Sequence, residues 1–171
     1  MSDALRAEVK GVADVREALM GVAPKLKVRA LRNALTAGAR LVQRAARKAT
    51  PVLDLSKEWS ASAYRKGYRK PGTVQKAISV RTSKLARRQG NVGVFVNVKP
   101  AKRGQAGAKS YRDPFYWRWL DRGWTPARGP RQPGRNILKA GAAMLGAALA
   151  EFNRRIPLAI AKLNKPKAPA P

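Results

Sequence analysis

Residues 24–49, PKLKVRALRNALTAGARLVQRAARKA, form the most regularly patterned segment of the sequence. Apolar and small side chains recur on one side of it, at Leu31, Leu35, Gly38, Val42 and Ala45. Polar and basic side chains occupy the opposite side, at Arg29, Asn33, Thr36, Arg40, Arg44 and Arg47. This 3.6-residue period predicts one long amphipathic helix. Pro24 suits its first position, and Thr50-Pro51 ends it.

Two segments downstream of this helix show the two-residue alternation of β-strands. In residues 74–81, VQKAISVR, the apolar Ile78 and Val80 are separated by polar side chains. Residues 91–98, NVGVFVNV, place four valines on one face. The basic connection between them ends in a Gln-Gly pair that suits a turn. We therefore predict an antiparallel hairpin with a long loop.

A second long helix is predicted from Asn136 to about Leu163. Asn136 can cap its first turn, and Pro157 should kink or end it. Before the first long helix, residues 7–12 predict a short strand, and Asp14 begins a short helix. The apolar stripe of the second long helix contains small residues that permit close packing, and it consists of Ile137, Gly141, Leu145, Ala148, Phe152 and Ile156.

These elements predict a single α+β domain over residues 1–164. Its small antiparallel β-sheet should pack against the long helix of the N-terminal half and against the C-terminal helix. Extended basic loops are expected at about 52–73 and 99–112. The composition of residues 165–171, KPKAPAP, predicts a disordered tail.

The chain contains no cysteine and no histidine. Disulfides, thiolate catalysis and zinc–cysteine sites are therefore excluded, and the commonest general acid/base is missing. Carboxylates alone can hold magnesium, but no motif joins Asp54, Glu58, Asp113 and Asp121. The segment RGQAGAKS lacks the spacing of a phosphate-binding loop. We predict that the protein is not an enzyme and has no cofactor and no metal.

Charge is the extreme property of this sequence. There are 37 Lys and Arg against 9 Asp and Glu, a net charge of +28. Such a charge repels itself in the folded state, so an anionic partner would relieve it. Nucleic acid is the commonest such partner, and an acidic protein surface or an anionic membrane is the rival. The first ten residues lack a signal-peptide pattern. The longest apolar run, residues 140–150, is too short to cross a bilayer. We therefore expect cytosolic synthesis and no membrane partner.

The basic residues concentrate in arms rather than in the predicted core. Residues 59–112 carry 14 Lys and Arg and no acidic residue, which is typical of an interaction arm. Tyr64 and Tyr68 alternate with cations there. This suits base stacking with phosphate contact, or equally an exposed loop whose tyrosines cover the sheet. The basic side of the long helix is likewise either solvated or in contact with a phosphate backbone or an acidic neighbour. The candidate contacts to DNA or to an acidic partner are Arg65, Lys66, Arg69, Lys70, Arg87, Arg88, Lys102, Arg103, Arg128, Arg131 and Arg135.

The order of these segments carries a family resemblance. VKGVADVREAL and then ALRNALTAGARLVQRAARKATP give a strand, a helix and a long helix, with Gly11 and Pro51 at their characteristic places. GTVQKAISVR follows, with Gly72, Ile78 and Val80 aligned, and then the valine-rich NVGVFVNV. In this order they resemble the tail-completion, or neck, proteins of long-tailed bacteriophages.

The closing part of the resemblance is FYWRWLDRGWTPARGPRQPGRNILKAGAAM, so that the whole spans residues 8 to about 152. Here Asp121 replaces the usual Glu, and Trp124 separates Gly123 from Thr125. The residues that match in outline are Tyr116, Trp119, Leu120, Asp121, Gly123 and Thr125.

The resemblance implies a structural virion protein at the joint between head and tail, assembled in the host cytoplasm. Such a protein forms a ring, expected to hold six copies, that contacts the tail terminator or tail tube protein and the head–tail connector, with no catalysis. Packaged DNA would pass its basic loops. The aromatic cluster is then either core alone or part core and part subunit interface. The candidate interface residues are Phe115, Tyr116, Trp117, Trp119, Asp121 and Trp124.

The alternative is a free basic nucleic-acid-binding protein. The net charge of +28 and the interleaved Tyr and Arg residues favour it. The sequence shows no helix-turn-helix, ribonucleoprotein or zinc-finger signature, which speaks against it.

Overall fold

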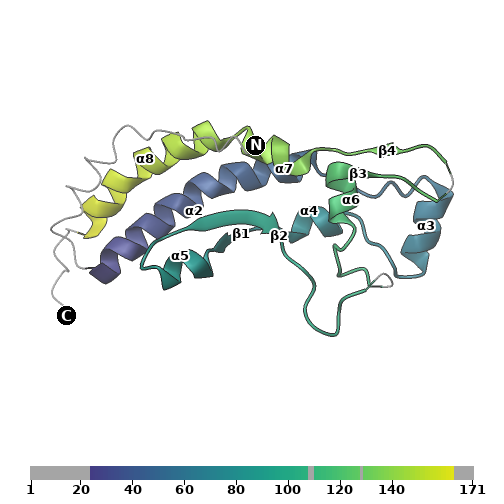
Figure 1. Cartoon of the computed structure of the whole chain (residues 1–171), viewed down its shortest axis with the longest axis horizontal. Coiled ribbons are helices and arrows are strands. Elements are labelled where there is room, and N and C mark those ends of the chain that lie inside the picture. The colour runs from purple at the N-terminus through teal and green to yellow at the C-terminus, as the bar shows by residue number, and fades with distance from the viewer. Residues whose placement is uncertain (1–23, 108–109, 128, 164–171) are drawn as a thin grey trace, which may run out of the picture.

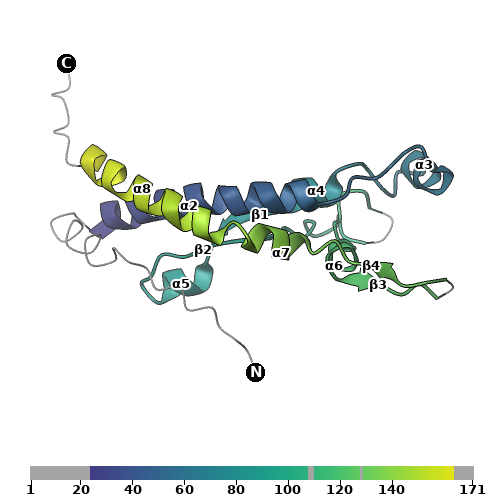
Figure 2. The same cartoon turned by 90° about the horizontal axis from the view of Figure 1, so that it is seen from above.

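The computed structural model describes residues 24–107, 110–127 and 129–163. Its central element is the 26-residue helix α2 (Pro24–Ala49). Helix α8 (Leu145–Leu163) lies beside α2 and runs in the opposite direction, and a β-hairpin packs on a different side of α2 (Figure 1). Seen from above, these elements form one elongated body (Figure 2). The predicted α+β class, with a small antiparallel sheet and two long helices, is confirmed.

The predicted bounds of α2 are correct, but its most buried side differs from the predicted stripe. Leu31 and Leu35 are only half-buried. The cause is α8, because a Cβ atom at Gly38 would collide with the backbone oxygen of Ala148. The two helices therefore cross too closely for leucine at the contact. The buried positions of α2 all carry small side chains or none, at Ala30, Ala34, Gly38 and Ala46.

Arg47, predicted on the exposed side of α2, reaches the hairpin instead. Its guanidinium donates two hydrogen bonds, of 3.2 and 2.9 Å, to the carbonyl oxygen of Ile78. The side-chain amide of Gln43 donates a third to the same oxygen at 2.8 Å. Thr36 is also half-buried. The predicted polar side is therefore exposed only at Arg29, Asn33, Arg40 and Arg44.

The predicted hairpin is present. Strand β1 (Ile78–Thr82) pairs antiparallel with β2 (Val94–Val98), and Ile78 lies opposite Val98. Both residues are buried because this face of the hairpin packs on α2. They belong to the central hydrophobic cluster, which consists of Ala46, Ile78, Val98 and Ile137.

Three short helices replace segments that were predicted as strand or irregular chain. Helix α3 (Glu58–Arg65) lies in the expected loop, and α5 (Lys84–Arg88) lies in the hairpin connection. Helix α4 (Thr73–Ala77) occupies the first half of the strand predicted over 74–81, so that prediction is corrected. Val74 lies four residues before Ile78, and both are buried. Their spacing fits one helical turn as well as it fits a strand.

The aromatic segment forms a helix followed by a tight return. Helix α6 (Trp117–Arg122) carries Trp117, Trp119 and Asp121. Strand β3 (Gly123–Trp124) then pairs antiparallel with β4 (Gln132–Pro133). A Cβ atom at Gly134 would collide with the backbone at the end of α6, so this return is closely packed.

The second long helix is divided into α7 (Ile137–Ala142) and α8. Asn136 precedes α7, but its side chain makes no capping hydrogen bond, and its φ of 50° is left-handed. The Asp121 carboxylate instead accepts a hydrogen bond of 3.0 Å from the backbone N–H of Leu138. The predicted cap by Asn136 is therefore wrong, and Asp121 takes that role from α6.

One further expectation about the second helix is corrected, because Leu145, predicted in the apolar stripe, is exposed at the start of α8. The predicted end near Leu163 is confirmed, and of the two outcomes predicted for Pro157 the ending of the helix does not occur. The strand expected at residues 7–12, the helix expected from Asp14 and the tail at 165–171 lie outside the described residues.

Candidate functional site

The basic–aromatic end of the molecule, where α3 and α6 lie, brings together two segments far apart in sequence (Figure 1). The guanidinium of Arg69 lies over the rings of Phe115 and Tyr116, with its central carbon 5.1 and 5.0 Å from their centroids. The Lys70 ammonium lies 4.0 Å from the centroid of the Tyr111 ring. Cation–π attraction of this kind favours these positions of the two cations beside the aromatic rings.

The hydroxyl pKa values of two tyrosines at this end are shifted in opposite directions. Burial raises the pKa of the Tyr116 hydroxyl. A hydrogen bond of 3.0 Å from the Arg112 guanidinium lowers the pKa of the Tyr111 hydroxyl, and the charges of Arg112 and Lys70 act in the same direction. The Tyr116 shift therefore reflects its burial, and the Tyr111 shift reflects its neighbouring cations.

Aromatic rings extend from this site to the surface. Phe115 contacts Tyr116 and Trp119 edge to face, with ring centroids 5.5 and 5.6 Å apart. Trp119 in turn lies 6.4 Å from Trp124. Trp119 is 52% exposed and Trp124 is 45% exposed. The two rings, here called the tryptophan pair, leave a large apolar surface in contact with water.

The other predicted interface residues lie deeper. Trp117 is half-buried and packs against the central hydrophobic cluster, so it is largely a core residue. Asp121 is buried and occupied by its hydrogen bond to Leu138. In the described chain its carboxylate holds α7 in place, while its part in a subunit interface stays a prediction.

The remaining predicted cations do not form one patch. Arg65 pairs with Glu58 on α3, and Lys66 next to it is exposed. Helix α5 lies far from α3 in both views of the chain (Figures 1 and 2). Arg128 lies outside the described residues. The others are exposed on α5, on the loop after β2 and around β4, at Arg87, Arg88, Lys102, Arg103, Arg131 and Arg135.

The four carboxylates considered for a metal have local roles. Asp54 accepts hydrogen bonds from the backbone and side chain of Ser56, and Asp113 accepts one from the backbone of Gly107. Glu58 pairs with Arg65, and Asp121 accepts the hydrogen bond from Leu138. Among the described residues no three acidic side chains gather where they could hold a metal ion.

A groove between α2 and α8, of about 620 Å³, was not predicted from the sequence. Arg40 and Arg44 of α2 line it, together with Glu151 and Arg155 of α8. The predicted polar side of α2 pointed to the two arginines, but nothing in the sequence placed α8 beside them. The remaining lining residues are Asn33, Thr36, Ala37, Leu41 and Gln43.

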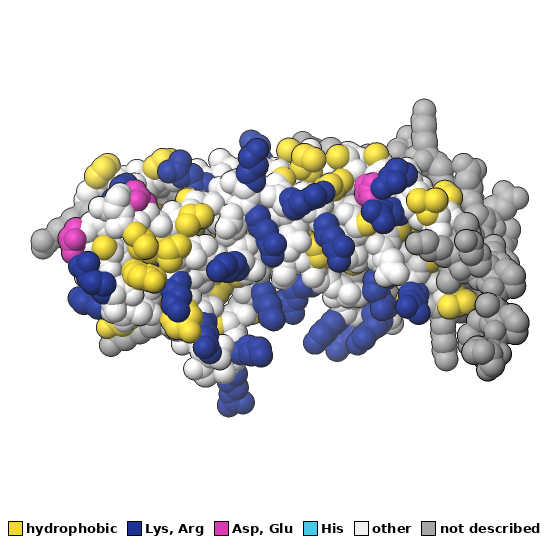
Figure 3. All heavy atoms as spheres, turned by 180° about the vertical axis from the view of Figure 1, so that it is seen from behind, with side chains coloured by type: hydrophobic (Ala, Val, Ile, Leu, Met, Phe, Trp, Pro, Cys, Tyr) yellow, Lys and Arg dark blue, Asp and Glu magenta, His cyan; other side chains and the backbone are white. Residues whose placement is uncertain are grey.

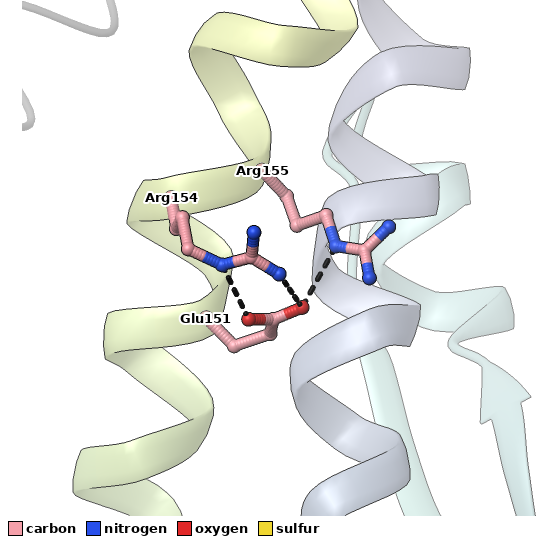
Figure 4. A network of polar contacts seen from close by, with 3 residues as sticks. All are labelled: Glu151, Arg154 and Arg155. Carbon is pink, nitrogen blue, oxygen red and sulfur yellow. Dashed lines mark hydrogen bonds and ion pairs between the residues drawn. The ribbon is translucent and has the colours of Figure 1, made fainter.

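Glu151 is the acidic residue of this groove, and two arginines occupy it (Figure 4). Arg154 donates two hydrogen bonds of 2.9 Å to its carboxylate, and Arg155 donates one of 2.7 Å. Hydrogen bonds from Arg154 and then from Arg155 lower the pKa of Glu151 to about 2. The carboxylate is therefore ionised at neutral pH, and its charge is more than balanced by its own helix.

Within the part of the chain that the structure describes, every helix is too short or too polar to span a bilayer. Comparisons with protein-family models, with curated proteins and with solved structures find no match to this chain.

Proposed function

We propose that this chain is a structural subunit of the neck of a long-tailed bacteriophage, where copies form a ring that joins the tail to the head–tail connector. The order of motifs from residue 8 to about 152 supports this function, as argued from the sequence. In this function the protein has no catalytic role. Its partners are further copies of itself, the tail terminator or tail tube protein and the connector, and packaged DNA passes by.

The observation that carries the proposal is the balance between buried and exposed apolar residues. Among the described residues, the buried hydrophobic side chains larger than alanine are Val74, Ile78, Val98, Pro114, Ile137 and Ile156. Twelve large hydrophobic residues are exposed, including both members of the tryptophan pair. A subunit with this balance gains stability by covering apolar surface with a partner.

The tryptophan pair is also held on a rigid support. Trp119 lies on α6, and Trp124 lies on β3, where the return through Gly134 is closely packed against the end of α6. Aromatic side chains fixed in this way lose little conformational entropy on association, which is the behaviour of interface hot spots.

Electron microscopy and mass photometry test the ring. The protein should form closed rings, either alone or when mixed with the tail tube or tail terminator protein of the same virus. The double variant Trp119→Ser/Trp124→Ser should lose the rings while its circular dichroism spectrum stays that of the folded monomer. Monomers in every mixture would contradict the proposal.

A matched control removes exposed apolar groups elsewhere. Leu85 on α5 and Leu158 on α8 are both exposed, so Leu85→Ser/Leu158→Ser makes a similar change away from α6. Rings should persist in this control. If both double variants abolish rings equally, the tryptophan pair has no special part in the interface.

A free basic nucleic-acid-binding protein is the second candidate function. The net charge of +28 favours this function. Between described residues only three ion pairs form, and they involve just two carboxylates, Glu58 and Glu151, so most cations are not balanced by an acidic side chain. Tight binding to random duplex DNA at about 0.1 M salt, with a steep salt dependence and no rings in any mixture, would favour this function.

A further inference from the structure

We propose that the groove between α2 and α8 is a binding site for the phosphate backbone of duplex DNA. This inference goes beyond the proposed function, because it holds for a ring subunit and for a monomer alike. The sequence offered the basic side of α2 as one possible phosphate contact. The structure adds the α8 wall, which brings Glu151 and Arg155 to Arg40 and Arg44 in one groove.

The charge of the groove is the first argument. Arg40, Arg44 and Arg155 line it against Glu151, which gives 3 − 1 = +2 from the lining residues. Glu151 is already held by Arg154 and Arg155. Neither Arg40 nor Arg44 forms an ion pair with another described residue, and both are exposed. Their guanidinium groups are thus available to an anion from solution.

The second argument is the rigidity of the groove. Its walls are the two long helices, which cross closely where Gly38 meets Ala148. Figure 4 shows the Arg155 side chain extending from α8 toward α2. Asn33 and Thr36 add hydrogen-bonding groups to the α2 wall. The backbone positions that carry these donors are therefore set before an anion binds.

The third argument is the length of the acid-free side of α2, which favours DNA over an acidic protein. Arg29, Arg40 and Arg44 lie on this side, and α2 contains no acidic residue. At 1.5 Å per residue the row from Arg29 to Arg44 spans about 22 Å. Further Lys and Arg side chains are spread over the described part of the face seen in Figure 3, with hydrophobic patches between some of them. Every duplex offers phosphates along such a row, whereas a protein would need carboxylates placed to match it.

The experiment measures binding of a fluorescently labelled random duplex by anisotropy over a series of salt concentrations. The double variant Arg40→Gln/Arg44→Gln should bind more weakly. Each lost phosphate contact lowers the magnitude of the slope of log K against log salt by about 0.9. For the double variant, the magnitude of this slope should therefore fall by about 1.8. Both side chains are exposed, and circular dichroism will verify that the variant remains folded.

The control has the same change in net charge at a different place. Lys76→Gln/Lys84→Gln removes two exposed cations from α4 and α5, which lie outside the groove and are not among the candidate contacts to DNA named from the sequence. It should leave the slope nearly unchanged. If the slope falls equally in the two double variants, the groove is not the DNA-binding site, because the loss of net charge alone would then explain both results.

A variant of opposite sign makes the test independent of any loss of folding. Glu151→Gln removes the negative charge from the groove and releases Arg154 and Arg155. It should tighten DNA binding, and each released arginine that gains a phosphate contact should add about 0.9 to the slope. Weaker or unchanged binding would count against the site.

The remaining outcomes are also decisive. If Arg40→Gln/Arg44→Gln weakens binding to polyglutamate but leaves the DNA slope unchanged, the groove binds an acidic protein and the DNA site is overturned. Ring assembly should be recorded for the same preparations. Rings together with an unchanged DNA slope overturn only the groove. A slope that depends on Arg40 and Arg44 in a protein that never forms rings overturns only the neck function.

Discussion

Gly38 shows how a single residue sets the packing of the two long helices. A Cβ atom there would collide with the backbone oxygen of Ala148, an atom that cannot move without shifting α8. Gly38→Ala should therefore destabilise the protein by about 1–3 kcal/mol, the usual cost of overpacking, despite the better helix propensity of alanine. Urea unfolding followed by circular dichroism measures this change.

Gly146 provides the matched control for this substitution. It lies in α8, but nothing stands within 4 Å of a Cβ atom placed there. Gly146→Ala should stabilise the protein by up to about 1 kcal/mol, because only the helix propensity changes. The same substitution thus has opposite signs at the two positions, and equal effects would show that the helices do not cross at Gly38.

Glu151 predicts a pH dependence of stability. Its pKa is about 2 in the folded protein against an ordinary value of 4.5, because Arg154 and Arg155 donate hydrogen bonds to it. A depressed pKa stabilises the fold fully above the unfolded value, and this stabilisation disappears as the pH falls toward the folded value. The melting temperature of the natural protein should exceed that of Glu151→Gln at pH 7. The difference should shrink between about pH 4.5 and 2, and a difference that grows there would contradict the ion pair.

Among the elements, α7 depends on a cap that comes from another helix. The Asp121 carboxylate on α6 accepts the Leu138 N–H, whereas Asn136 makes no side-chain capping bond. Asp121→Ala should therefore cost about 0.5–2 kcal/mol of unfolding free energy. Asn136→Gly should cost little or be stabilising, because glycine suits the φ of 50°. Chemical denaturation of both variants measures this, and the reverse order would restore Asn136 as the cap.

The sequence was sufficient for elements whose periodicity is long or strict. The bounds of α2 and the pairing of β1 with β2 follow from patterns of 3.6 and two residues. The pattern was ambiguous for α4, since Val74 and Ile78 stand four apart and fit either structure. The buried side of α2 could not be predicted, because it depends on the close contact with α8. Smaller residues are buried there, and Leu31 and Leu35 are only half-buried.

Long-range contacts likewise limited what could be predicted of the candidate sites. The cations at 65–70 and the aromatic residues at 115–124 were both recognisable in the sequence. Their meeting at Arg69 was not, because 45 or more residues separate them along the chain. The groove could not be predicted either, because it forms only where α8 packs on α2. The ion pair between Glu151 and Arg155 could have been predicted, since the two residues stand four apart on one helix.

The molecule as a whole combines a net charge of +28 with a small hydrophobic core. Repulsion among cations destabilises the folded state, and few acidic residues are present to offset it. Salt weakens this repulsion, since the screening length falls from about 30 Å at 0.01 M to about 3 Å at 1 M. Salt also weakens the ion pairs of Glu58 and Glu151, but these pairs are far fewer than the unbalanced cations.

The melting temperature should therefore rise with sodium chloride over this range, as measured by scanning calorimetry at neutral pH. The control Lys76→Gln/Lys84→Gln carries two fewer charges and should show a smaller rise. A melting temperature that falls with salt would mean that attraction between specific pairs outweighs the repulsion. In that case the excess charge would already be balanced within the monomer, and the argument that it calls for an anionic partner would lose its basis.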